Sequence, residues 1–278
     1  MQRSIPSSSD ANPAIKFENV RIGFEEGDIL RDVSFQVQER ETLVLLGETG
    51  TGKTLSLKLA AGLLRPSAGI IQVLGKEISS MPERDLLEFR RHIGFVFQEG
   101  ALFDSMTVGD NVAYRLLEDG VKGQEIEPRV LEALRFVELE HTVELFPSEL
   151  SGGMRRRVSI ARALINQPPI VLYDSPTAGL DPVTSQKIIS LILRLRDVFG
   201  VTALLATQRL QDGFALANFR FDPGAKRVVH SASNGRPASV ASAAETRFLV
   251  LREGGVYFEG GQEELSSTKD DYLKRFLV

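Results

Sequence analysis

Between an apolar run and a helical pattern, residues 47–54 are Gly47-Glu48-Thr49-Gly50-Thr51-Gly52-Lys53-Thr54. The run before them, TLVLL at 42–46, is typical of a buried strand. The spacing G-x-x-x-x-G-K-[ST] between a strand and a helix is that of a loop that wraps phosphates. Glycines let backbone N–H groups turn inward, and the N-terminus of a helix adds unpaired N–H groups and a positive dipole end. We expect this stretch to hold nucleotide phosphates, with Lys53 on the β- and γ-phosphates and Thr54 on Mg²⁺.

Other apolar runs define the fold class around this loop. IGFVF at 93–97, IVLYD at 170–174 and VTALLA at 201–206 are predicted as further buried strands, separated by helical patterns. Residues 15–38 alternate loosely and predict antiparallel strands, whereas 99–165 are mostly helical in pattern. The sequence therefore predicts an α/β fold: a phosphate-loop core with a mainly parallel sheet, an N-terminal antiparallel β subdomain and an inserted α-helical subdomain.

We expect a single domain over 15–278 after a disordered leader at 1–14. Residues 222–246 are rich in Ser, Ala and Gly and are predicted as a long loop insertion. The chain then resumes with a strand pair that turns at Gly254–Gly255, and the last residues, DDYLKRFLV, predict an amphipathic helix.

Composition narrows the class of protein further. The chain has 278 residues, 42% of them hydrophobic and 25% charged, as in a soluble globular protein. Thirty-three Lys and Arg against 37 Asp and Glu give a net charge of −4, which argues against a nucleic-acid partner. The absence of cysteine excludes disulfides, thiol catalysis and Cys-ligated zinc. No apolar run is long enough to span a bilayer, so we expect a cytoplasmic protein.

Two more elements complete a nucleotide site. Asp174 ends a buried apolar strand, where a carboxylate is costly unless it meets a cation such as Mg²⁺. The segment Ser151-Gly152-Gly153-Met154 precedes a helical pattern, with Ser151 as a good N-cap. Its helix would present one apolar face and a second anion-binding N-terminus.

The order of these motifs resembles that of ATP-binding cassette (ABC) ATPases over residues 15–278. The resemblance rests on loop 47–54, on the segment from Leu150 to Met154 (LSGGM, the family signature), on Asp174 and on Ala178-Gly179-Leu180-Asp181. It implies that ATP and Mg²⁺ are the cofactors and that Phe24 stacks on adenine. It also implies that Thr54, Gln98 and Asp174 hold Mg²⁺.

The same resemblance implies partners. In the family two chains pair head to tail, so Ser151, Gly152 and Gly153 would bind the ATP held by the other chain. The surface near Gln98 would face an integral-membrane permease, which places the chain on the cytoplasmic face of the inner membrane. Residues 100–116 (GALFDSMTVGDNVAYRL) and 146–154 (FPSELSGGM) are similar to the ATPase subunits of Mla-type lipid-trafficking systems, which work with MCE-domain proteins.

Two positions depart from the family pattern, and both concern hydrolysis. The family has a glutamate after the strand-ending aspartate, where this chain has Ser175, and a histidine after the next strand, where this chain has Gln208. Serine without an activating neighbour is no general base at neutral pH, and loss of that catalysis costs about 10²–10⁴-fold in rate. Gln208 could still orient a water, and Glu99 is the nearest replacement carboxylate by motif position.

These departures leave several hypotheses open. The chain forms a homodimer that hydrolyses ATP slowly, or it pairs with a different ATPase subunit and serves as a regulatory ATP clamp. A soluble ABC ATPase acting on DNA or ribosomes is disfavoured, because Lys53 and Ser151 are only 98 residues apart, without sustained heptads, and the chain carries one cassette.

Overall fold

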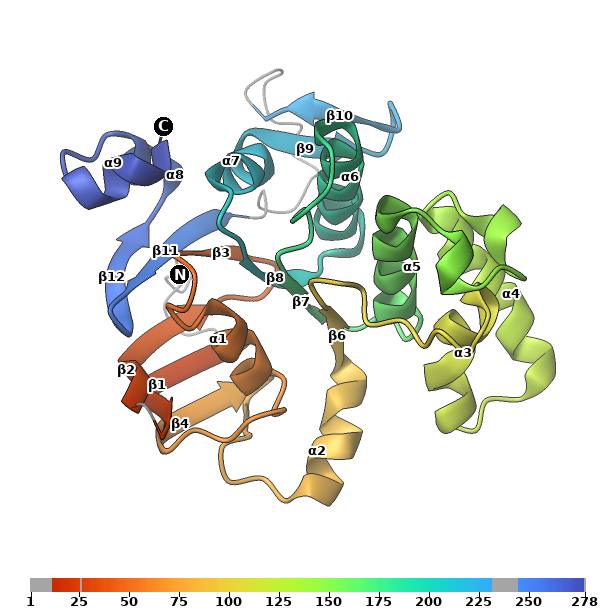
Figure 1. The fold of residues 1–278 in the computed structure, drawn as a ribbon, viewed down its shortest axis with the longest axis horizontal. Helices are drawn as coiled ribbons and strands as arrows, with labels where there is room; N and C mark the ends of the chain where they lie inside the picture. The colour runs from red at the N-terminus through yellow and green to blue at the C-terminus, as the bar shows by residue number, and fades with distance from the viewer. Residues whose placement is uncertain (1–11, 26, 232–244, 278) are drawn as a thin grey trace, which may run out of the picture.

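The computed structural model describes residues 12–25, 27–231 and 245–277. Its centre is a six-stranded sheet in the order β12-β11-β3-β8-β7-β6 (Figure 1). The five strands from β11 to β6 are mutually parallel, and β12 is antiparallel at the edge. The strands are β3 Thr42–Leu46, β6 Ile93–Val96, β7 Ile170–Asp174, β8 Thr202–Ala206, β11 Thr246–Arg252 and β12 Gly255–Gly260. The predicted mainly parallel sheet, its strands and the final strand pair are confirmed.

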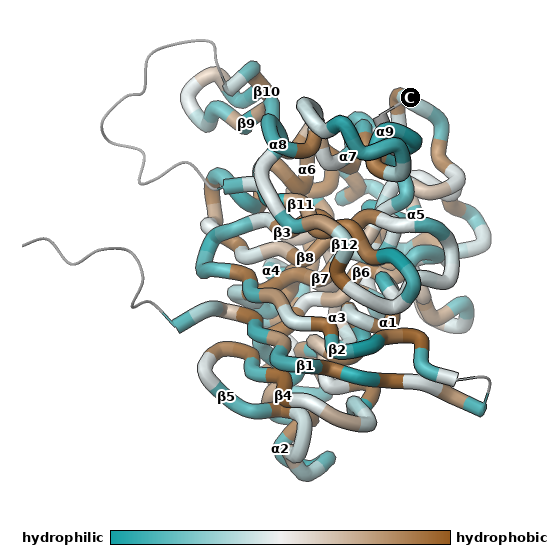
Figure 2. The backbone as a smooth tube through the Cα atoms, turned by 90° about the vertical axis from the view of Figure 1, so that its left-hand side faces the viewer, coloured by the Kyte–Doolittle hydropathy of each residue, from teal (hydrophilic) through white to brown (hydrophobic). Residues whose placement is uncertain are grey.

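Apolar runs form these strands because both faces of the sheet are covered. In β3, Val44 and Leu46 belong to one core cluster, and Leu43 and Leu45 to the other. A strand with two buried faces cannot alternate with polar residues, so its sequence is continuously hydrophobic. Figure 2 shows this as a hydrophobic band through the middle of the molecule.

The second sheet is antiparallel and lies against one face of the first, with the order β2-β1-β4-β5. Its strands are β1 Ile15–Phe24, β2 Gly27–Val37, β4 Ala68–Val73 and β5 Lys76–Glu77. The hairpin predicted over 15–38 is confirmed, since Ile15 pairs with Val37 and Phe24 with Gly27. The sequence analysis did not predict β4 and β5, which extend this sheet.

Helices cover both faces and one end of the parallel sheet (Figure 1). The helical region predicted at 99–165 holds α3, α4 and α5, which pack on one another. The helices are α1 Lys53–Ala60, α2 Glu83–Phe89, α3 Val108–Glu118, α4 Gly123–Phe136, α5 Gly152–Leu164, α6 Pro182–Phe199, α7 Leu210–Asn218, α8 Gln262–Ser266 and α9 Asp271–Leu277, with short 3₁₀ turns at Arg90–His92, Glu140–Thr142 and Pro147–Glu149.

Side-chain caps place the starts of three of these helices. Thr107 and Asp110 form a reciprocal capping box on α3, and the Ser151 hydroxyl accepts a hydrogen bond from the Met154 amide at the start of α5. Asp181 caps α6, which begins with Pro182 and ends at Gly200 in the left-handed conformation.

The prediction of a loop over 222–246 is wrong in part. β9 Phe219–Asp222 and β10 Arg227–His230 form an antiparallel hairpin, and β11 begins at Thr246; residues 232–244 lie outside the described residues. The two strands are only four residues long each, too short to produce an alternating pattern that stands out.

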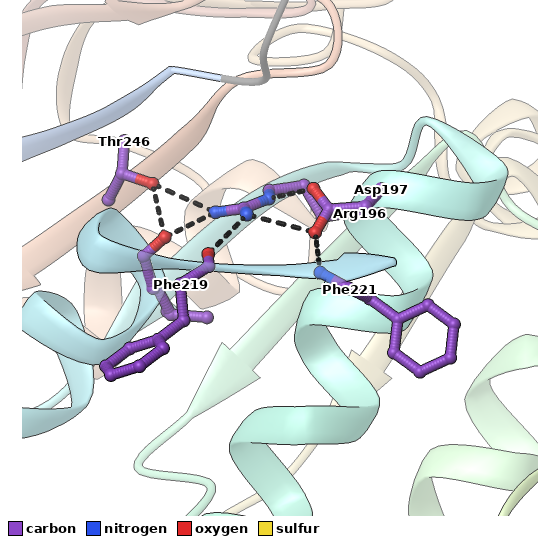
Figure 3. A network of polar contacts seen from close by, with 6 residues as sticks. Arg196, Asp197, Phe219, Phe221 and Thr246 are labelled. Carbon is purple, nitrogen blue, oxygen red and sulfur yellow. Dashed lines mark hydrogen bonds and ion pairs between the residues drawn. The ribbon is translucent and has the colours of Figure 1, made fainter. Parts of the chain in front are cut away.

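A buried ion pair anchors this hairpin to α6 (Figure 3). The Arg196 guanidinium pairs with Asp197 and donates to the carbonyl oxygens of Leu216 and Phe219, while the Asp197 carboxylate accepts from the Phe221 amide at 2.6 Å. The charged residues that make these contacts lie in α6, outside residues 222–246. The composition of 222–246 therefore could not predict the hairpin or its anchor.

The predictions for the two ends are only partly covered by the described residues. Most of the predicted leader, residues 1–11, lies outside them, whereas Ala14 is buried and accepts a hydrogen bond from the Leu74 amide. The C-terminal helix is present as α9, with Leu273 buried. Within the described residues, no helix is both long and apolar enough to cross a membrane.

Candidate nucleotide-binding site

The predicted site residues follow four adjacent parallel strands at one edge of the sheet. Loop 47–52 follows β3, Gln208 follows β8, Ser175 follows β7 and Gln98 follows β6, and the sheet order is β3-β8-β7-β6. The carboxyl ends of parallel strands are where open α/β sheets bind ligands. Strand order thus brings together residues that are up to 161 positions apart in the chain (208 − 47).

Loop 47–52 has the backbone conformation that a phosphate cradle needs. Gly47, Gly50 and Gly52 have positive φ angles of 150°, 84° and 97°. A Cβ at Gly52 would lie 2.2 Å from the Leu30 side chain, so glycine is required there by space as well as by conformation. Helix α1 begins at Lys53 directly after the loop, with no side-chain cap, which leaves its first N–H groups available to an anion.

Lys53 and Asp174 are both buried polar side chains at the inner wall of the loop. The Lys53 ammonium donates to the carbonyl oxygens of Gly47 at 2.8 Å and Glu48 at 2.7 Å. Burial lowers the pKa of Lys53, although the carboxylates of Asp174 and Glu48 oppose that shift. Lys53 therefore lies inside the loop, where its charge would face bound phosphates.

Thr54 and Asp174 form the pair that a magnesium site needs. The Thr54 hydroxyl donates to Asp174 Oδ1 at 3.1 Å, across the intervening strand β8. Burial raises the pKa of Asp174, while hydrogen bonds from Thr54 and Ser175 lower it. A carboxylate whose charged form is disfavoured by burial is stabilised by a cation.

These residues fit Mg²⁺ as it is bound beside nucleotide phosphates. Among the described residues there is no cluster of three or more His, Cys, Asp or Glu that would form an all-protein metal cage. Mg²⁺ typically takes one or two protein oxygens and completes its shell with phosphates and water. Thr54 and Asp174 supply such oxygens.

The two positions that depart from the family pattern lie at the same edge. The Ser175 amide donates to the Ala206 carbonyl at 2.8 Å, and its φ of 47° is in the left-handed region. The Gln208 amide group donates to the Thr49 hydroxyl at 3.1 Å, so this side chain reaches the phosphate loop. Ser175 thus forms a tight turn after Asp174, and the Gln208 side chain contacts loop 47–52.

Two of the predicted site residues, Phe24 and Gln98, are exposed. Phe24 lies at the tip of the β1–β2 hairpin with 59% of its surface exposed, and the same hairpin packs Leu30 against Gly52. Gln98 is exposed in the turn after β6, with Glu99 beside it. Among the described residues, no hydrogen bond joins Phe24 or Gln98 to loop 47–54. The adenine-stacking role of Phe24 and the Mg²⁺ role of Gln98 therefore stay predictions.

The predicted second phosphate site is an exposed helix N-terminus. Ser151 and Gly152 are exposed at the start of α5, and Gly153 is buried against Thr184 of α6. Met154, Val158, Ala161 and Ile165 pack into or against the core, which confirms the predicted apolar face. This N-terminus belongs to a different helix from the one that begins at Lys53, as two separate anion sites require.

Sequence reasoning missed two parts of the site. One is a buried network in which the Thr177 and Thr207 hydroxyls both donate to the Asp212 carboxylate, joining the turn after β7 to the loop after β8. The other is Arg156, the middle one of three consecutive arginines in α5. Its neighbours at three-residue spacing, Gly153 and Ser159, are small and buried, a signal that this face of α5 is closely packed.

The geometry is that of a nucleoside-triphosphate-binding protein, with a glycine-rich phosphate loop that opens a helix and a threonine–aspartate pair beside it. Residues 30–178 match the ABC transporter family. The chain therefore belongs to the ABC transporter family, as an ATPase domain that uses ATP and Mg²⁺.

Relatives of this chain include importer subunits. It is 39% identical over 200 residues to methionine import ATP-binding protein MetN 2 of Bacillus cereus, covering 70% of this chain and 59% of the relative. It is 40% identical over 198 residues to the probable ribonucleotide transport ATP-binding protein mkl of Mycobacterium leprae, covering 71% and 57%. The chain thus spans less than two thirds of the length of these relatives.

Solved structures agree with the fold. The dimeric ATP-binding cassette MJ0796, bound to ADP and phosphate in a post-hydrolysis state, has a TM-score of 0.73 at 29% identity, over 89% of this chain and 98% of the other. The protein cbiO1 of Clostridium perfringens, part of an ABC transporter complex, has a TM-score of 0.75 at 25% identity, over 95% of each chain.

Proposed function

We propose that this chain is the ATP-binding subunit of a bacterial ABC transporter, in which ATP-driven pairing of two ATPase chains moves an integral-membrane permease. The observation that carries the proposal is the pairing of Thr54 with Asp174 beside loop 47–52, together with a separate exposed N-terminus at Ser151. One chain has a complete half-site for ATP and a second anion site that its own loop does not use. A second ATPase chain supplies the missing half.

The permease would dock beside the Gln98 loop. A hollow of about 450 Å³ lies there, and its lining combines aromatic residues of the loop and of α3 with four arginines, at positions 90, 91, 115 and 162. The ring centroids of Phe103 and Tyr114 lie 4.9 Å apart within it. The buried Asn111 side chain fixes the backbone at Phe103, because it accepts a hydrogen bond from the Phe103 amide and donates one to the Phe103 carbonyl. A firmly held hollow with both aromatic and arginine side chains fits a short segment of a membrane protein that presents apolar and acidic groups.

We propose that the chain's own site binds Mg-ATP well and hydrolyses it slowly. The binding groups of loop 47–54 and Asp174 have the geometry described above, whereas position 175 carries a hydroxyl instead of a carboxylate. Gln208, held on Thr49, can orient a water but cannot accept its proton as a carboxylate does. The homodimer that cycles slowly and the heterodimer that uses this chain as an ATP clamp both remain candidates.

We propose that the transported molecule is a lipid. Lipid trafficking with an MCE-domain protein rests on the similarity of 100–116 and 146–154 to Mla-type subunits, while the relatives are named for methionine and ribonucleotide transport. The first of these segments runs from the docking hollow into α3, so it bears on the permease partner. We retain lipid as the proposed cargo, and the permease that binds the chain is the means to test it.

Co-purification from membranes tests this function. The tagged wild-type chain is expected to retain a polytopic membrane protein on the inner membrane, and Phe103→Asp is expected to lose it while still binding ATP. The matched control is Phe199→Asp, since Phe199 is similarly exposed but lies on α6, away from the hollow. Retention by the Phe103 variant, or equal loss by both variants, would contradict the docking proposal; an MCE-domain protein in the complex would support lipid trafficking.

A further inference from the structure

Three consecutive arginines, 155–157, follow the exposed start of α5, and each donates to a backbone carbonyl. Arg155 contacts Leu150 at 2.6 Å and Arg157 contacts Val137 at 2.8 Å, both within the helical region. Arg156 donates instead to the carbonyl of Ser175, at 3.0 Å. Of the three, only Arg156 reaches the turn that carries the magnesium carboxylate.

The surroundings of Arg156 also differ from those of its neighbours. Only 6% of its surface is exposed, whereas Arg155 and Arg157 are half-buried. Burial lowers the pKa of Arg156, and the nearby carboxylates of Asp174 and Glu99 oppose that shift. Burying a guanidinium is costly unless it is paired or hydrogen-bonded. The carboxylates of Asp174 and Glu99 and the carbonyl of Ser175 offset that cost for Arg156.

The turn that Arg156 contacts is conformationally demanding. Ser175 has a φ of 47°, in the left-handed region that disfavours residues with a Cβ. Its amide is held by the Ala206 carbonyl of β8, and its carbonyl by Arg156. The Ser175 carbonyl also accepts from the Ala178 amide at 3.0 Å, so three hydrogen bonds hold the backbone of the residue that follows Asp174, and Arg156 supplies the one that comes from α5.

Helix α5 also holds the Gln98 loop. The Arg162 guanidinium donates to the carbonyls of Gly100 at 2.8 Å and Ala101 at 2.7 Å, and Gly100 packs against the helix backbone at Arg155. Helix α5 is therefore hydrogen-bonded both to the Asp174–Ser175 turn, through Arg156, and to the loop after β6, through Arg162.

We propose that Arg156 is a positioning residue for ATP hydrolysis: it fixes the Asp174–Ser175 turn, so that the helix whose N-terminus faces the other chain's ATP also sets the geometry of this chain's own site. The proposal rests on the proposed function and deepens it. It acts through the turn and not by touching nucleotide.

Arg156→Met and Arg157→Met form a matched pair, since both remove one arginine-to-carbonyl hydrogen bond from the same helix. Hydrogen exchange followed by mass spectrometry is the first readout. For Arg156→Met we expect exchange of the peptide spanning 174–180 to rise about tenfold or more, with loop 47–54 unchanged, because one opening restraint is lost. Arg157→Met should leave 174–180 unchanged. Equal exchange in the two variants would overturn the proposal.

Single-turnover hydrolysis is the second readout, measured in the wild type and in a Ser175→Glu background. Arg156→Met should lower the rate constant at saturating Mg-ATP by about tenfold while the Kd for a non-hydrolysable ATP analogue changes less than about threefold, because positioning acts on the chemical step. Arg156→Lys, which retains the charge and much of the length, should recover part of the rate. A Kd that rises in proportion to the lost rate would contradict a positioning role.

The exchange measurement keeps this proposal separate from the proposed function. If Lys53→Ala leaves the turnover of Ser175→Glu intact, the account of the ATP site fails, but exchange at 174–180 still decides the role of Arg156. If Arg156→Met does not fold, Arg156→Gln decides, because its shorter, neutral side chain removes the guanidinium: unchanged exchange at 174–180 together with an unchanged rate would overturn the proposal.

Discussion

The chain contains two glycine-flanked helix N-termini that differ in how they are built. Helix α1 starts from Gly52, in the left-handed conformation and with no side-chain cap, at the inner edge of the parallel sheet. Helix α5 starts from Ser151, in the extended conformation, with its hydroxyl bonded to the Met154 amide and with Ser151 and Gly152 exposed. Both can bind an anion, but only the first is surrounded by its own lysine and magnesium carboxylate.

The difference shows what each N-terminus can do alone. The uncapped α1 begins with the buried Lys53 and lies beside the buried Asp174; phosphates and a cation would stabilise the charges of these two side chains. In α5 the Ser151 hydroxyl already accepts from the Met154 amide, so this N-terminus would offer only part of a site. Under the proposed function, the chain binds ATP at its own loop and a second chain closes over that site.

Replacing Lys53 with alanine should produce the largest change. We expect Lys53→Ala to weaken ATP binding by about 100-fold or more, because a buried charge on the phosphates is lost. Ser151→Ala should change the affinity of the dilute, monomeric chain less than about threefold, since the proposed function assigns the start of α5 to the nucleotide of a second chain. Titration of a fluorescent ATP analogue checks both. Equal losses in the two variants would contradict the division between the sites.

Replacing Gly52 with alanine should lower the free energy of unfolding more than replacing Gly152. Gly52→Ala places a Cβ 2.2 Å from the Leu30 side chain at a φ of 97°, whereas Gly152→Ala meets only Leu180 at 3.8 Å. We expect Gly52→Ala to cost about 1–3 kcal/mol of unfolding free energy and Gly152→Ala less than about 0.5 kcal/mol. Urea unfolding measures the difference, and a Gly152 variant as unstable as the Gly52 variant would refute it.

Gln208→Ala should have a moderate effect on turnover. The Gln208 amide is held on Thr49 of the phosphate loop, so its loss should lower the single-turnover rate by about three- to tenfold and affect ATP affinity much less. Gln208→Glu serves as the size-matched control. A rate unaffected by the alanine change would mean that another group orients the water.

The smallest expected effect is on pH-dependent stability. Burial raises the pKa of Asp212, although hydrogen bonds from Thr177 and Thr207 and the charge of Arg209 oppose that shift. The folded state therefore binds this proton more tightly than the unfolded state, so the contribution of Asp212 is full below about pH 3.9 and is lost as the pH rises through the raised pKa.

Asp212→Asn removes that titration. Its thermal stability relative to the wild type should increase as the pH rises from about 4 to 7, because only the wild type loses stability over that range. Thermal unfolding at several pH values tests this, with Asp222→Asn, on the exposed β9–β10 hairpin, as the control. A relative stability that stays flat or falls with pH would contradict the raised pKa.

Local patterns predicted most of the fold and the phosphate half of the site. Loop 47–54 and the buried strands have signals within a few residues, because the sheet is covered on both faces and the loop requires glycine. The β9–β10 hairpin and the Asp212 network could not be predicted, since their strands are short and their contacts join residues far apart in the chain. Arg156 belongs to the same group: its partner Ser175 is 19 positions away, across a packed interface.

Single-turnover hydrolysis of Mg-ATP by the purified chain, with and without Ser175→Glu, is the most direct test of the proposal that binding is intact while the chemical step is slow. We expect slow turnover that Lys53→Ala abolishes and that Ser175→Glu increases by about tenfold or more, because a carboxylate next to Asp174 supplies a general base. A wild-type rate that depends on Lys53 but is unchanged by Ser175→Glu would contradict this account and assign the positioning of water to another group.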